Sequence, residues 1–125
     1  MSLTTLSERD VAGLQAVYYL ATGVWPLLHR RSFEQLTGKK TDFWLAQTVG
    51  ITVMSIGAAL AQANRSTRRR PPPELRTVAC ASAAGLALID VVFVARRQIS
   101  AVYLLDAAAE LALLGAWSFT DRRGR

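Results

Sequence analysis

Three acidic residues stand inside otherwise apolar stretches of this 125-residue chain. Asp90 lies in one such stretch, and Asp106 and Glu110 lie in the next. Residues four apart share a face of a helix, so Asp106 and Glu110 present their carboxyl groups together. Like charges gathered away from water cannot all ionise, and we expect at least one of the three groups to keep its proton near neutral pH. The pattern predicts a site that handles protons or binds a cation.

Polar residues on two other segments are spaced to join the acids in one pocket. Their depth and helical spacing predict five further pocket residues: Gln15, Tyr18, Tyr19, Gln47 and Thr48. The same acids could instead pair with tyrosine or glutamine side chains only to hold the helices together, because interhelical polar contacts are common in membrane bundles. The sequence leaves both interpretations open.

Four apolar segments carry these residues, over 10–28, 43–63, 75–95 and 99–119. Each has about the 20 residues that cross a ~30 Å hydrocarbon core. The fifteen Lys and Arg residues lie at the ends of these segments or between them, whereas a soluble bundle would carry charge along the outer face of each helix. We therefore predict an all-α fold, a four-transmembrane-helix bundle, that forms a single integral membrane domain over residues 1–125.

The connecting segments contain recognisable start and stop patterns. Ser7, with Asp10 three residues later, resembles an N-cap for the first helix. Ser32-Phe33-Glu34-Gln35 resembles a capping box, which predicts a short amphipathic surface helix in the first loop, ended by Thr37-Gly38. Segment 64–74 is a basic, proline-rich linker. Only Arg96-Arg97-Gln98 separates the last two helices, so we expect a tight hairpin that brings Asp90 and Asp106 to similar depth.

The basic residues predict a topology and a partner. With four spans both termini share a side, and that side holds nine of the fifteen Lys and Arg residues. This bias predicts cytoplasmic termini and a multi-pass protein of the bacterial inner or plasma membrane. The net charge is +6, but the basic clusters flank apolar runs, which favours anionic lipid head groups over nucleic acid. The head-group contacts are expected at Arg68, Arg69 and Arg70.

Metal and cofactor chemistry has little support in the composition. One cysteine, Cys80, and one histidine, His29, exclude an internal disulfide and argue against multi-cysteine or His-rich metal ligation. We expect no cofactor and no metal. His29, beside two arginines at the end of a predicted helix, is interpreted as an interfacial anchor. Trp25, Trp44 and Trp117 are interpreted as belt or packing aromatics.

The first half of the chain resembles small four-helix membrane proteins of bacteria that have no assigned activity. The resemblance is carried by the following motifs: Tyr18-Tyr19-Leu20, Trp25-Pro26-Leu27, Ser32-Phe33-Glu34, Thr37-Gly38 and Lys40-Thr41-Asp42-Phe43-Trp44-Leu45. It implies fold and location only. Small multidrug transporters have a similar size and number of spans, but they carry an essential Glu in the first helix, where this chain has Gln15.

Three functions remain possible on these grounds. We rank first a binding, transport-type or accessory membrane protein whose acidic pocket takes a proton, a cation or an amphipathic small molecule. An intramembrane enzyme that uses paired acids on a lipid or isoprenoid ranks second, and we identify no catalytic residues for it. The third is a structural subunit of a membrane complex or a homo-oligomer, which the small-residue stripe Ala108, Ala112 and Ala116 would serve.

Overall fold

A computed structural model describes residues 7–38, 43–66 and 70–120. In these ranges the regular elements are all helices and there is no strand, which confirms the all-α prediction. The helices are α1 (Glu8–Leu28), α2 (Arg30–Thr37), α3 (Phe43–Arg65), α4 (Pro73–Ala95) and α5 (Tyr103–Ser118). By length and composition, α1, α3 and α4 could each cross a membrane. At 16 residues, α5 extends over roughly 24 Å.

The cap of α1 is as predicted, and the cap of α2 is not. The Ser7 side chain accepts a hydrogen bond from the Asp10 backbone, and the Asp10 side chain accepts one from the Ser7 backbone. For α2 we predicted a start at Ser32, but His29 is the N-cap and its Nδ1 accepts the Ser32 N–H. The histidine ring supplies the acceptor that we had assigned to the serine hydroxyl. Gly38, at φ 101°, ends α2 as predicted.

The connection between α4 and α5 is longer than the sequence indicated. Arg97 adopts a left-handed conformation with φ 59°, and the Gln98 N–H bonds to the Phe93 carbonyl, which ends α4. Turns then continue to Val102, so α5 begins at Tyr103 and not near residue 99. Asp106 consequently lies in the first turn of α5.

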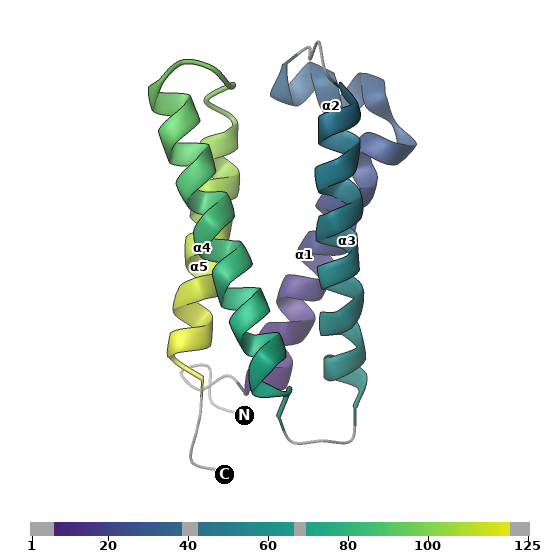
Figure 1. The fold of residues 1–125 in the computed structure, drawn as a ribbon, viewed down its shortest axis with the longest axis vertical. Helices are drawn as coiled ribbons and strands as arrows, with labels where there is room; N and C mark the ends of the chain where they lie inside the picture. The colour runs from purple at the N-terminus through teal and green to yellow at the C-terminus, as the bar shows by residue number, and fades with distance from the viewer. Residues whose placement is uncertain (1–6, 39–42, 67–69, 121–125) are drawn as a thin grey trace.

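The long helices associate as two pairs, α1 with α3 and α4 with α5, and the two pairs make far fewer contacts with each other. Figure 1 shows the pairs close together where α1 starts and α4 starts, and diverging toward α2 and the α4–α5 turn. We call the first end the basal end and the second the apical end. α3 ends and α4 begins at the basal end.

Glycines set the close approach of α1 and α3. A Cβ atom added at Gly23 would lie 2.6 Å from the Gly50 carbonyl oxygen, and one added at Gly57 would lie 3.0 Å from a Leu20 side-chain carbon. Absence of side chains at these positions lets the two backbones touch. Gly23, Gly50 and Gly57 are therefore helix-contact positions.

Alanines form the buried face of α4. Ala79, Ala83 and Ala87 are spaced at four-residue intervals and are all buried. On α5 the predicted small-residue stripe is only partly used, because Ala116 packs against the core while Ala108 and Ala112 are exposed.

Large apolar side chains remain exposed along all four long helices. On α1, α3 and α4 they include Leu14, Val17, Trp44, Ile51, Leu88 and Ile89, and on α5 Leu104, Leu105 and Leu111. Such a surface is costly in water and normal against lipid.

Candidate functional site

The three carboxyl groups that the sequence singled out meet between α4 and α5. Asp90 lies near the apical end of α4, Asp106 in the first turn of α5, and Glu110 one turn further along α5. The Asp106 carboxyl is within hydrogen-bonding reach of both Asp90 and Glu110. Two ionised carboxylates repel at this distance, whereas a pair that shares a proton forms an O–H···O hydrogen bond. The arrangement therefore suits a bound proton or another positive charge.

Two tyrosines of α1 reach across to these acids. The Tyr18 hydroxyl donates a hydrogen bond to Asp106 Oδ1, and the Tyr19 hydroxyl donates one to Glu110 Oε1 at 2.8 Å. Adjacent residues of a helix point about 100° apart. The two tyrosine hydroxyls can therefore reach two different acids, which lie one turn apart on α5. We call Tyr18, Tyr19, Asp90, Asp106 and Glu110 the acid cluster.

One oxygen of the acid cluster lacks a donor. Asp90 is only 5% exposed, and its Oδ2 is buried without a hydrogen-bond partner among the described residues. A buried acceptor left unsatisfied costs about 1–3 kcal/mol, and more if it is charged. The members of the cluster differ in burial: Glu110 and Tyr19 are buried, whereas Asp106 and Tyr18 are partly exposed. The unsatisfied oxygen is thus the feature that most needs a proton or a cation.

Gln15 lies one turn closer to the basal end than the acid cluster. It is fully buried, donates to the Ala79 carbonyl at 3.1 Å and accepts from the Trp117 indole N–H at 2.7 Å. Its side chain also comes within hydrogen-bonding reach of the Tyr19 hydroxyl. Gln15 therefore joins α1 to both α4 and α5, directly below the acids.

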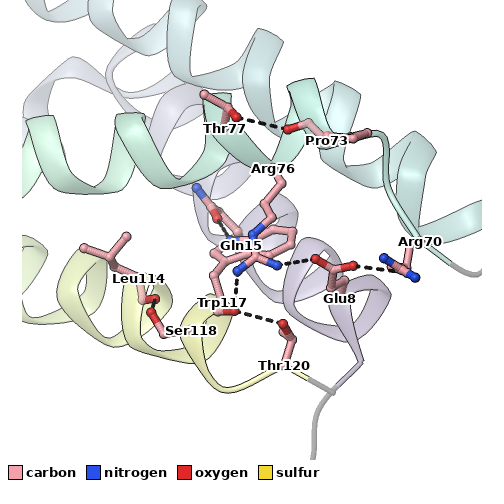
Figure 2. Close-up of polar contacts among 10 residues, drawn as sticks. All are labelled: Glu8, Gln15, Arg70, Pro73, Arg76, Thr77, Leu114, Trp117, Ser118 and Thr120. Atoms are coloured by element: carbon pink, nitrogen blue, oxygen red, sulfur yellow. Dashed lines mark hydrogen bonds and ion pairs between the residues drawn. The ribbon is translucent and has the colours of Figure 1, made fainter. Parts of the chain in front are cut away.

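A second polar centre, which we did not predict from the sequence, lies at the basal end (Figure 2). Glu8 is 4% exposed and pairs with the Arg76 guanidinium, which also donates to the Trp117 carbonyl at 3.0 Å. Arg70 approaches Glu8 at 3.8 Å. We call Glu8, Gln15, Arg76 and Trp117 the basal node. Two features of the sequence could have indicated this centre: Glu8 at the start of one apolar helix and Arg76 near the start of another.

The remaining predicted site residues lie elsewhere. Thr48 is exposed, and its hydroxyl donates to the Trp44 carbonyl of its own helix. Gln47 is half-buried and makes no hydrogen bond or ion pair within the described ranges. Of the three predicted lipid-binding arginines, Arg70 pairs with Glu8, and Arg68 and Arg69 lie outside the described residues.

Within the described part of the chain, no three His, Cys, Asp or Glu residues are grouped so as to hold a metal ion.

No protein-family model, curated protein or solved structure matches this chain. The resemblance carried by the first half of the sequence therefore stays a prediction.

Proposed function

We propose that this chain is a four-span membrane protein that holds a proton, or a small monovalent cation in its place, at the acid cluster. Three helices are long and apolar enough to cross a membrane. The short α5 is the fourth span in this proposal, because it packs along α4 and exposes large apolar side chains, with Leu105 71% exposed. In the sequence, segments 1–9, 64–76 and 121–125 carry nine of the fifteen Lys and Arg residues, so in this proposal the basal end, where α1 and α4 begin, faces the cytoplasm.

The observation that carries the binding proposal is the unsatisfied Asp90 oxygen beside Asp106. An ionised carboxylate in the hydrocarbon region costs about 2.5–3.5 kcal/mol on insertion scales, and this cluster contains three acids. No arginine or lysine is paired with Asp90, Asp106 or Glu110 within the described residues. A proton or a monovalent cation between Asp90 and Asp106 would remove the repulsion and satisfy the free oxygen.

The structural alternative also has a specific observation in its favour. The bonds from Tyr18 to Asp106 and from Tyr19 to Glu110 join the two helix pairs, and the acids could serve only as their acceptors. The two functions differ in whether the cluster exchanges protons with the solution.

The test compares wild type with the Asp106→Asn, Glu110→Gln variant in detergent, by thermal unfolding from pH 5 to 9. If the folded state holds a proton that the unfolded chain releases above about pH 5, wild-type stability falls as the pH rises. The amides keep their hydrogen-bonding capacity but cannot ionise, so the variant should lose the part of this dependence that comes from Asp106 and Glu110 and keep only the part that comes from Asp90. Glu74→Gln, at an exposed position in the first turn of α4, is the control for removing an acid elsewhere and should keep the wild-type profile.

Added salts identify the bound species. Stabilisation of the wild type at pH 9 by sodium or potassium chloride, but not by choline chloride, indicates a metal cation; no difference among the salts indicates a proton. Identical pH profiles for wild type and the double variant, together with equal response to all three salts, would leave only the structural role.

A further inference from the structure

The acid cluster and the basal node are parts of one series of polar contacts that extends along the bundle, formed by side chains and, between Trp117 and Arg76, by the Trp117 backbone carbonyl. From the partly exposed apical acid to the basal end, the series passes through Asp106, Glu110, Tyr19, Gln15, Trp117, Arg76 and Glu8. Its members come from α1, α4 and α5. Figure 2 shows the basal half of this series, with Gln15, Trp117, Arg76 and Glu8 in sequence.

The acids at the apical end of this series and the Gln15–Trp117 pair next to them differ in whether they can exchange protons. The carboxyl groups of the acids can gain or lose a proton, whereas the Tyr19 hydroxyl donates a hydrogen bond to Glu110. The Gln15 amide and the Trp117 indole keep their protons near neutral pH and act only as fixed donors and acceptors. Gln15 and Trp117 are both fully buried, and they fill the space between Glu110 and the basal end. As long as they remain bonded, the acid cluster is cut off from the basal side.

The arrangement of the two helix pairs would allow the basal node to open. The helix pairs meet at the basal end and diverge at the apical end (Figure 1), while each pair is packed along its own length. Of the two partly exposed members of the cluster, Asp106 and Tyr18, Asp106 lies toward the apical end, in the first turn of α5. A rocking of one pair against the other would separate the node and open the cluster to the basal side.

We propose that the basal node is a closed gate, and that in a second conformation it opens and exposes the acid cluster to the basal side, so that the chain carries its bound proton or cation across the membrane. This inference rests on the proposed function for its cargo, but the gate can be tested without the acids. Opening breaks three contacts of the node between the helix pairs: Trp117 Nε1 to Gln15 Oε1, Gln15 Nε2 to the Ala79 carbonyl, and Arg76 to Glu8.

The first test measures access by cysteine labelling. Cys80 is replaced by Ala, and Ala83→Cys places a thiol on the buried face of α4, at a fully buried position between Ala79 beside the node and Asp90. A membrane-impermeant maleimide is added to inverted vesicles, which present the basal side, and to spheroplasts, which present the apical side. With an intact node, the thiol should react slowly from the basal side.

The informative variant is Trp117→Phe, which removes the indole donor and leaves Gln15 Oε1 buried without it. Opening to water relieves this loss, so the basal labelling rate should rise about five- to a hundredfold. Adding Gln15→Leu removes the unsatisfied oxygen and should return labelling close to the starting rate. Asn64→Ala is the matched control, because Asn64 lies at the basal end of α3 and bonds to the Arg9 carbonyl within the α1–α3 pair; its labelling rate should stay unchanged.

If Trp117→Phe does not fold, as judged by gel filtration in detergent, Glu8→Gln replaces it. That variant keeps a hydrogen-bond acceptor for Arg76 and removes only the charge, and it should raise basal labelling several-fold. Equal rates in the starting protein and in whichever of these variants folds would overturn the gate, and so would rapid basal labelling with the node intact.

The second test measures flux. Proteoliposomes that contain pyranine and have their membrane potential clamped by potassium and valinomycin are given a pH gradient. Trp117→Phe should admit protons several-fold faster than wild type, and adding Asp106→Asn and Glu110→Gln should abolish the increase. Faster labelling without any flux would leave the gate in place and reject transport of protons. Flux that persists in the variant without Asp106 and Glu110 would reject these two acids as its route.

Discussion

The contact between α1 and α3 makes a sharp prediction at Gly50. A Cβ atom added there would overlap the Gly23 carbonyl oxygen, and it would also lie 3.3 Å from the Pro26 ring. The overlapping atom belongs to the backbone of α1, so no side-chain rotation can relieve the clash. The helices must instead separate, which loosens the packing around Gly23, Gly50 and Gly57. Gly50→Ala should therefore destabilise the folded protein.

The magnitude follows from the kind of atom that is displaced. Inserting a methyl group into a well-packed interior typically costs about 1–3 kcal/mol, and a contact with backbone favours the upper half of this range. Gly85 provides the matched control, because it is also a mid-helix glycine and a Cβ atom added to it meets nothing within 4 Å. Gly85→Ala should be neutral or should stabilise the protein by up to about 1 kcal/mol.

The assay is reversible unfolding in mixed micelles, with increasing sodium dodecyl sulfate and helical content as the readout. Both variants add the same methyl group to a helix, so any effect on helix propensity cancels in the comparison. Equal stabilities for Gly50→Ala and Gly85→Ala, within about 0.5 kcal/mol, would mean that α1 and α3 are not in backbone contact and that these two helices do not pair through their glycines.

Three further predictions concern the membrane and the two polar centres. The protein should stay in the membrane after carbonate extraction, and a reporter at its C-terminus should respond as cytoplasmic; recovery of a soluble monomer without detergent contradicts both. Tyr19→Phe should cost about 1–3 kcal/mol in the same micelle assay, because it leaves the buried Glu110 Oε1 without its donor, and Tyr18→Phe should cost less because water can reach Asp106. Arg76→Met should cost about 3 kcal/mol, since Glu8 then keeps only the more distant Arg70; a loss below about 0.5 kcal/mol in unfolding experiments would show that the Glu8 ion pair is unimportant.

Local features were readable from the sequence because each depends on residues close together in the chain. The Ser7 cap, the glycine at the end of α2 and the boundaries of α3 near Phe43 and of α4 near Ala95 follow from spacing alone. The four-residue interval between Asp106 and Glu110 is sufficient by itself to place them on one face of a helix. The contrast between apolar segments and flanking charge predicted the membrane-capable helices in the same way.

The residues at which one helix ends and the next begins were less predictable from the sequence. The turn after α4 depends on a single residue, Arg97, in a left-handed conformation, and nothing in its type requires this. The consequence is large for the site, because α5 starts at Tyr103 and Asp106 falls in its first turn. The identity of the α2 cap was missed for a similar reason, since both His29 and Ser32 offer an acceptor.

Only the tertiary structure decided which helices pair and which polar groups meet. Periodicity assigns a residue to a face of its helix, but the partner of that face depends on packing between segments far apart in the chain. Gln47 and Thr48 had a plausible depth, yet α3 turns its glycines toward α1 and leaves Thr48 exposed. Trp117 could have been a belt residue, and it is instead buried against Gln15, 102 residues away. Close backbone contact and buried hydrogen bonding are properties of the assembled interior, and for that reason they appear only once the helices are packed.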